Sequence, residues 1–460
     1  MAKKRKTQAV ILIHGIGEQR PMDTLRSFVD AVLPEPESGQ KYFSKPDTLS
    51  DILELRKLQD RDQPRTHFFE YYWAYKVEGT TFSHVFDWLK SLLLRRPMKI
   101  PPHLLPLYFV TWLLVLSTIF FFGLGFADWI MDTAQRLPSF YVSIASFVLL
   151  SAVQYIVLKY IGDAARYLSP NPRNIALRRE IRSDGLKLLR AIHKSIDPVY
   201  DRVCIVGHSL GSIIGYDILR QFWTECNELY TNPHNCEQKA LEAVETIGGS
   251  LTAVNNSETL ATWQSAQIDL WAELQGLGCP WKVTDFITIG SPLAHAAMLM
   301  AIDETDLKLR QEQRELPTNP PVPEHTKKGK LKYSYVWDPD EVDGKKIRLA
   351  RLHHAALFAC TRWTNLFYPV TCGFFGDIIG GPLQRWFGKG IRDISVGFQG
   401  VISKTPISHV MYWNPKKRKP KKGNNALDTL ILALDRDGDE IFQALEKVEA
   451  VRDNPLPDSE

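Results

Sequence analysis

Two long apolar segments limit most strongly how this chain can fold. Leu104 to Ala127 spans 24 residues and Leu137 to Leu158 spans 22, and neither contains a charged side chain. As helices rising ~1.5 Å per residue, both are long enough to cross a ~30 Å hydrocarbon layer. A pair of buried core helices is the alternative, but soluble domains seldom contain two such uncharged helices in tandem. We therefore expect a transmembrane hairpin, connected by the short turn 128–136.

The charges that flank these segments predict their orientation. Four basic residues and no acidic one precede the first segment: Lys90, Arg95, Arg96 and Lys99. Five basic residues follow the second segment, with Asp163 as the one acidic residue among them: Lys159, Arg166, Arg173, Arg178 and Arg179. Positive flanks stay in the cytosol, so an integral membrane protein with a cytoplasmic catalytic domain is expected. A basic run, Lys416 to Lys422, is predicted to contact anionic headgroups, although a solvated loop or a chance resemblance to a nuclear signal would look the same.

Composition is that of a folded protein with a sizeable core. The 460 residues are 44% hydrophobic and 23% charged, enough for two or three average domains or one large domain with insertions. The net charge of +4 is too small to imply nucleic acid as a partner. Six cysteines without C-x-x-C spacing argue against a zinc site or a disulfide framework and suit a reducing compartment. No metal or organic cofactor is expected.

Short apolar runs that alternate with helical patterns predict an α/β fold with a parallel sheet. The expected strands are Ala9–Ile13, Thr66–Ala74 and Val283–Ile289, with weaker ones at Arg362–Phe367 and Ile391–Phe398. The expected helices cover Thr24–Leu33, most of Gln221–Trp281, and Ala426 to about Val451, whereas Glu304–Lys346 is polar and expected to be rich in loops. The apolar run Ala9–Ile13 is too short for a signal peptide and is expected to enter the first strand directly.

The stretch "VCIVGHSLGSIIGYDIL", Val203 to Leu219, has the pattern of a strand, a tight turn and a helix. Gly207 and Gly211 on either side of Ser209 would allow the strand and helix backbones to approach closely. A helix that begins at once directs backbone N–H groups toward the turn, which suits a developing oxyanion. Ser209 is therefore predicted to be a nucleophile, with an ordinary turn serine as the alternative.

A serine nucleophile of this kind needs a histidine base and a carboxylate, in the chain order Ser, Asp, His. His409, in "PISHVMYWN", is the best-placed C-terminal histidine, although a surface loop histidine would look the same. Asp377, in "GFFGDIIGG", is favoured as the acid because it follows an expected strand and lies between glycines. Asp393, in "RDISV", also precedes His409 and is the rival.

Two backbone N–H groups would be needed to hold an oxyanion. One is expected from Leu210, directly after the nucleophile. The other is expected from Ile16, in the loop "HGIGEQ" that follows the first strand. This loop is also an ordinary strand-to-helix turn, and the two interpretations do not compete.

Taken together, "VILIHGIGEQ", "VCIVGHSLGS", "ITIGSPL", "RWTNLFYPV…GDIIGG" and "SHVMYW" resemble the lipase and esterase branch of the α/β-hydrolase superfamily. The resemblance implies Ser209 as nucleophile, Asp377 as acid and His409 as base. Two departures stand out: the antiparallel strands that open the full fold are expected to be missing, and the apolar hairpin lies between the second expected strand and the nucleophile strand. The expected organisation is a first part of the hydrolase core at 1–95, the hairpin at 104–160, the rest of the core at 180–413, and a basic segment with a C-terminal helix at 414–460.

The sequence thus predicts a membrane-anchored serine hydrolase of carboxylic esters, with lipid esters favoured by the membrane location. An acyltransferase or a thioesterase could use the same triad. A non-catalytic membrane scaffold with a hydrolase fold is the alternative from another class.

Overall fold

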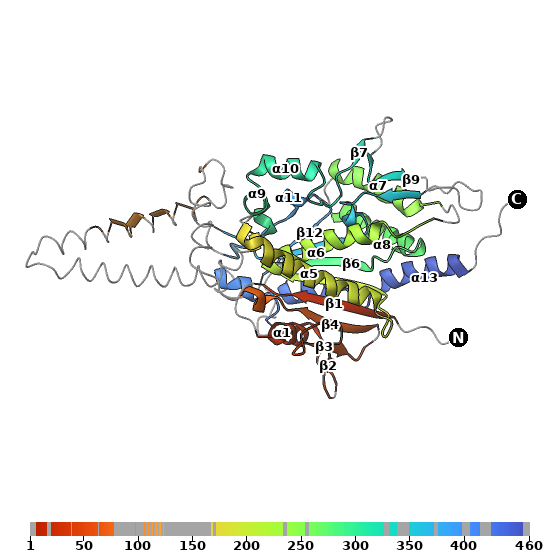
Figure 1. Ribbon diagram of the computed structural model, residues 1–460, viewed down its shortest axis with the longest axis horizontal. Helices are drawn as coiled ribbons and strands as arrows, with labels where there is room; N and C mark the ends of the chain where they lie inside the picture. Colours follow the sequence, from red (N-terminus) through yellow and green to blue (C-terminus); the bar gives the residue numbers. More distant parts are fainter. Residues whose placement is uncertain are drawn as a thin grey trace, which may run out of the picture.

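The computed structural model describes most of the chain outside the apolar segments (Figure 1). The residues that it does not describe are 1–5, 16–19, 38, 63, 78–96, 169–171, 233–236, 254–256, 326–330, 338–348, 372–375, 398–404, 415–424 and 454–460. Between 98 and 166 it describes ten positions, 105, 108, 109, 112, 113, 116, 117, 119, 120 and 123. The basic run 416–422 and Ile16 therefore lie outside the described residues.

An eight-stranded sheet forms the centre of the molecule, in the order β12-β11-β6-β5-β1-β4-β3-β2. The strands are β1 (Thr7–Ile13), β2 (Tyr42–Pro46), β3 (Arg56–Asp60), β4 (Arg65–Tyr71), β5 (Arg202–His208), β6 (Val283–Ile289), β11 (Arg362–Phe367) and β12 (Arg392–Ser395). From β12 to β4 every neighbouring pair is parallel, and only β3 and β2 join antiparallel. The predicted α/β class with a mostly parallel sheet is confirmed.

Helices cover both faces of this sheet because its strands alternate their side chains between two apolar cores. On β1, Ile11 and Ile13 point into one core, whereas Val10 and Leu12 point into the other. The first core receives α5 (Pro172–Lys194), α6 (Leu210–Asn227), α7 (Lys239–Ala253), α8 (Ser257–Gly276) and α13 (Asp439–Asp453). The second receives α1 (Asp23–Val32) and α12 (Ala426–Leu434).

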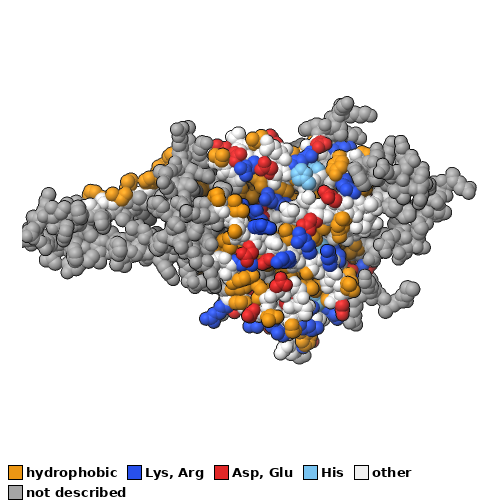
Figure 2. Space-filling model, viewed as in Figure 1, with side chains coloured by type: hydrophobic (Ala, Val, Ile, Leu, Met, Phe, Trp, Pro, Cys, Tyr) orange, Lys and Arg blue, Asp and Glu red, His pale blue; other side chains and the backbone are white. Residues whose placement is uncertain are grey.

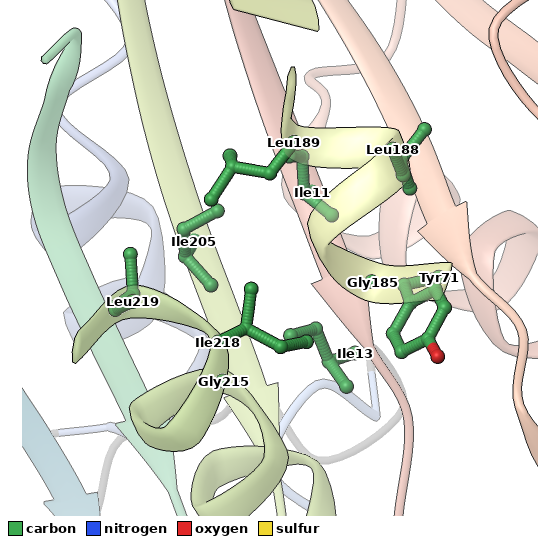
Figure 3. Close-up of a pocket in the computed structure, with 10 residues that line it drawn as sticks. All are labelled: Ile11, Ile13, Tyr71, Gly185, Leu188, Leu189, Ile205, Gly215, Ile218 and Leu219. Atoms are coloured by element: carbon green, nitrogen blue, oxygen red, sulfur yellow. The ribbon is translucent and has the colours of Figure 1, made fainter. Parts of the chain in front are cut away.

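The layer between the sheet and the helix pair α5 and α6 is closely packed. A cavity of about 10 Å³ lies there among apolar side chains of β1, β5, α5 and α6, including Ile11, Ile205 and Leu189 (Figure 3). A gap of this size is at the lower limit for a single water, and its lining offers almost no polar partner. It is a packing gap rather than a ligand site.

Smaller elements connect the main ones. These are η1 (Ala74–Val77), η4 (Pro292–His295), α9 (Ala296–Leu299), α10 (Glu304–Glu312), β7 (Glu324–His325), β8 (Leu331–Lys332), β9 (Ser334–Trp337), β10 (Leu349–Leu352), η5 (Leu357–Ala359), α11 (Gln384–Phe387) and η7 (Pro406–Val410). The segment 304–346 is thus more regular than expected. It begins with α10 because the Asp303 side chain accepts hydrogen bonds from the Thr305 and Asp306 amides and caps the helix.

Two further expectations about the chain order were wrong. The antiparallel strands β2 and β3 were not predicted, because β2 is mostly exposed and neither strand shows a clear apolar alternation. The apolar segments consequently fall after the fourth strand, not the second. The single C-terminal helix is instead two, α12 and α13, because Asp435 and Gly438 adopt positive φ angles of 45° and 59° that end one helix and precede the next.

The described residues of the first apolar segment project from the rest of the molecule. They lie at one end of the structure (brown, at left in Figure 1), where α5 also begins. Large apolar side chains there are more than half exposed: Phe109, Leu113, Leu116, Ile119 and Phe120. Among the described residues, no helix is long and apolar enough to cross a membrane. Most of 104–127 and all of 137–158 lie outside those residues.

A buried ion network joins the central strands to the C-terminal helices. The Asp285 carboxylate on β6 accepts hydrogen bonds from Arg202 at 2.6 Å and from Arg362 at 2.7 Å. The Arg202 guanidinium, which is fully buried, also donates to the backbone carbonyl of Asp435 beyond α12. Burial alone would raise the pKa of Asp285, but the two arginines lower it to about 2. The carboxylate is therefore charged in the folded protein at neutral pH.

Asp285→Asn should lower the free energy of unfolding by about 3–5 kcal/mol, because it leaves buried guanidinium groups without their counter-charge. The pKa of Asp285 is lower when folded than the ordinary ~3.9, so its stabilisation is complete above about pH 4 and is lost as the pH falls toward 2. Chemical unfolding of the full chain from pH 7 to pH 3 measures both effects. Asp62→Asn, at an exposed carboxylate, is the control and should change stability by less than about 0.5 kcal/mol. Equal stability of the two variants would contradict this role.

Candidate active site

The carboxyl ends of the central parallel strands meet at one edge of the sheet. The register pairs Ile13 of β1 with Gly207 of β5, and His208 of β5 with Ile289 of β6. Leu366 of β11 pairs with the same Ile289. The loops that follow these four strands therefore begin side by side. Ligand sites of open α/β sheets lie at this edge.

Ser209 occupies a strained turn between β5 and α6. Its φ of 52° and ψ of −128° form a conformation that residues with a side chain seldom adopt. The turn is held by the Ser209 amide, which donates to the Ile289 carbonyl at 2.9 Å. It also needs Gly211, where a Cβ would lie 2.1 Å from the Ile13 carbonyl oxygen. The strain and the close approach are those that a nucleophile elbow requires.

His409, which is half-buried, and the buried Asp377 form a pair at the same edge. The Nδ1 of His409, in η7, lies 3.0 Å from each carboxylate oxygen of Asp377. Because a carboxylate only accepts, Nδ1 carries a proton, and in the neutral imidazole Nε2 keeps its lone pair. Burial alone would raise the pKa of Asp377, but the adjacent imidazole and several hydrogen-bond donors lower it to about 2. Asp377 is thus a charged acceptor that fixes one tautomer of His409.

Backbone and phenol donors hold Asp377 in place. The amides of Ile379 and Gly380 donate to Oδ1, each at 3.0 Å, and the Tyr412 hydroxyl donates to Oδ2 at 2.7 Å. The sequence analysis did not assign a role to Tyr412, although it lies three residues after His409 in the quoted "SHVMYW". This spacing, close to one helical turn, could have indicated that His409 and Tyr412 share a hydrogen-bond acceptor.

Gly290 brings Ser209 and the His–Asp pair to one place. It follows Ile289, the acceptor of the Ser209 amide, and has a positive φ of 56°. A Cβ at Gly290 would lie 2.9 Å from the Asp377 Oδ2 and 3.0 Å from the His409 Nδ1. His208, next to Ser209, contacts His409 as well, since its Nε2 lies 2.9 Å from the His409 carbonyl oxygen. No hydrogen bond joins the Ser209 hydroxyl to His409 within the described residues, and such contacts often tighten only around substrate.

Asp393, the rival acid, has a different environment. Its carboxylate accepts from the amides of Leu383 and Gln384, each at 2.8 Å, and from the Asn365 side chain at 2.8 Å. These bonds secure the start of α11 and leave Asp393 apart from His409. Burial, the largest influence, raises the pKa of Asp393. Of the two candidate acids, the structure pairs Asp377 with the histidine.

Of the two predicted oxyanion donors, the structure describes Leu210 but not Ile16. Leu210 is the first residue of α6, and the first amides of a helix have no acceptor within it. Ile16 lies outside the described residues, but the start of its loop is firmly placed. His14 stacks on Trp73 with ring centroids 5.1 Å apart, and the Trp73 indole N–H donates to the His14 carbonyl at 3.0 Å. Burial lowers the pKa of His14 to about 4, so this ring is neutral at pH 7.

Comparisons with known proteins give no family for this chain. A scan against models of protein families found no match, and searches of curated proteins and of solved structures found none either. Among the described residues, no group of three or more His, Cys, Asp or Glu side chains is arranged to hold a metal ion. The described cysteines, Cys204, Cys226, Cys279 and Cys360, are buried free thiols.

Proposed function

We propose that this protein is a membrane-anchored serine hydrolase that cleaves carboxylic esters, most readily those of lipids, and that it is a member of the α/β-hydrolase superfamily. One observation carries the proposal. Ser209 sits in a strained strand-to-helix turn at the sheet edge where His409 is paired with the buried Asp377. A strained serine, an oriented imidazole and a charged carboxylate are the parts that acyl transfer by a serine needs.

In the proposed reaction, the Ser209 Oγ attacks the ester carbonyl carbon and its proton passes to the His409 Nε2. The electron pair of the carbonyl bond moves to oxygen, and the oxyanion accepts hydrogen bonds from the Leu210 amide and from Ile16. When the tetrahedral species collapses, the bond to the alcohol oxygen breaks and His409 gives that oxygen its proton. Water, deprotonated by His409, then attacks the acyl-enzyme and releases the carboxylic acid and the free serine.

The lipid preference and the membrane location rest on the apolar segments. The described residues of the first segment expose Phe109, Leu113, Leu116 and Phe120, which recur every three or four positions and so share one helix face. A large exposed apolar face on a projecting element is costly in water and marks a membrane or protein contact. The uncharged length of both segments favours the membrane. An active site held beside a bilayer meets acyl esters at high local concentration.

Ser209→Ala should reduce the turnover of a short-chain aryl ester to below a tenth of the wild-type rate, because no other group can form the acyl-enzyme. Ser265→Ala, which removes an exposed hydroxyl that is bonded to Glu440, is the control and should keep full activity. Steady-state kinetics on the purified full chain gives both values. Retained activity in Ser209→Ala would show that another group is the nucleophile. A wild-type chain without turnover would support the alternative of a non-catalytic membrane scaffold.

Asp377→Asn and Asp393→Asn form a matched pair, since both replace a carboxylate near the sheet edge that is bonded to backbone amides. Asp377→Asn should lower kcat by ~10⁴-fold, the effect of losing the tautomer-fixing acid in a well-studied triad. Asp393→Asn should lower the melting temperature and leave kcat within about threefold, because Asp393 binds backbone amides rather than the histidine. The opposite ranking of the two kcat values would assign the acid to Asp393.

Deletion of residues 104–158 should release the protein from membranes, because each segment buries about twenty apolar side chains in the bilayer. The full chain should resist alkaline carbonate and high salt. Neutralising the basic run 416–422 should leave it bound, since each basic residue contributes only ~1 kcal/mol near anionic lipid and salt screens it. Fractionation followed by immunoblotting measures this. A full chain that washes off in carbonate, or a deletion that stays bound, would contradict the anchor.

A further inference from the structure

A groove of about 410 Å³ lies between α5 and α6, and five arginines line it. Arg178, Arg179, Arg182 and Arg190 recur at three-, four- and eight-residue spacings on one face of α5, and Arg220 faces them from α6. The groove begins about 12 Å along α6 from Ser209, at ~1.5 Å per residue. Figure 2, in which α5 crosses the front of the molecule, shows Lys and Arg side chains over this region with Asp and Glu side chains among them. Its volume is within the range of small-molecule sites.

Two carboxylates in the groove are already neutralised by arginines. The Arg190 guanidinium binds both carboxylate oxygens of Glu225, at 2.8 and 2.5 Å. Asp217 accepts from Arg182 at 3.0 Å and pairs with Arg220 at 3.3 Å. Among the described residues that line the groove, five guanidinium groups face these two carboxylates, an excess of three positive charges. Such an excess favours an anionic ligand.

Arg178 has a side-chain donor that an anion could satisfy. Its Nε atom is buried and has no hydrogen-bond acceptor among the described residues. Burial, and then the like charge of Arg182, lowers the pKa of Arg178. Arg179, one residue on, is exposed at the same groove. A planar guanidinium is well suited to a phosphoryl group, which it can bind through two oxygens at once.

The apolar part of the groove indicates where the anion comes from. Ile175 lines it from the first turn of α5 and is 55% exposed, and Leu186 lines it further along. The start of α5 lies at the end of the molecule from which the exposed apolar residues project (Figure 1). An apolar entrance toward that end, followed by arginines, matches an amphiphile whose charged head points inward.

We propose that the groove between α5 and α6 binds the phosphoryl group of an anionic phospholipid headgroup, at a site separate from the catalytic residues. The lipid source rests on the proposed membrane location, whereas the affinity for phosphoryl groups rests on the arginines alone. Bound anionic lipid would hold the domain with the start of α5 toward the bilayer surface.

The test uses the full chain in neutral detergent, with Ser209→Ala so that no lipid is hydrolysed. Isothermal titration with dihexanoyl phosphatidic acid should give saturable binding. Arg178→Gln/Arg179→Gln should weaken that binding at least tenfold, because neither arginine is paired with a carboxylate among the described residues and each substitution removes a charge-assisted contact. The matched control, Lys187→Gln/Lys194→Gln, removes two charges from the same helix outside the groove and should change the affinity less than twofold.

Four results would overturn the proposal. The first is the absence of saturable binding. The second is an equal loss of affinity in the lysine control, since the effect would then be one of general charge. The third is equally tight binding of dihexanoyl phosphatidylcholine, which would assign the affinity to the acyl chains. The fourth is equally tight binding of inorganic phosphate, which would make free phosphate the ligand. Because no turnover is measured, failure here leaves the hydrolase proposal to its own kinetic test.

Discussion

The backbone of Ser209 is the constraint on which the site depends. A φ of 52° is unfavourable for serine, and it persists because the Ser209 amide is bonded to β6 and α6 starts directly against the end of β1. Three adjacent parallel strands thus fix one residue. The same arrangement puts Gly290 beside the pair of His409 and Asp377. A change in the register of these strands would separate Ser209 from His409 even with every side chain unchanged.

The carboxylates at the two ends of the sheet have different roles. Asp377, with Tyr412, holds the orientation of His409, and Asp393 secures a helix start, whereas Asp285 joins the opposite ends of the strands to the C-terminal helices. Asp377 and Asp285 are both buried and Asp393 is half-buried, so burial does not distinguish these roles. Their partners do, because only Asp377 is bonded to a side chain that can transfer a proton.

How much the sequence could predict depended on how local each signal was. The strands around Ile11 and Ile205 are short apolar runs and the strand around Ile287 is rich in β-branched residues, so a buried parallel arrangement could be predicted from the sequence. The turn at Ser209 could be predicted because its glycines, strand and helix all lie within seventeen residues. The edge strands β2 and β3 were missed because half-exposed strands need no apolar pattern. The sequence alone could not decide between Asp377 and Asp393, because the fold determines which of them lies beside His409. It also could not predict the arginine groove, because the groove forms where two helices pack along their lengths.

The proposed hydrolase and the proposed anion groove use the same helix, α6, at different points. Its first amides lie beside the turn at Ser209, and its later turns carry Asp217 and Arg220 into the groove. A lipid bound in the groove would therefore lie along the helix that begins beside the proposed nucleophile. Both proposals require the helix to be rigid, and its wholly buried face between Ile213 and Phe222 supports this.

The reactivity of Ser209 is the most direct measure of the central claim that the strained turn holds an activated nucleophile. The full chain would be treated with a fluorophosphonate, which phosphonylates activated serines, and the modified peptide would be identified by mass spectrometry. We expect a single adduct on Ser209 that forms at least a hundredfold more slowly when Asp377 is replaced by asparagine. An adduct on a different serine, or none in a chain that hydrolyses esters, would contradict the account.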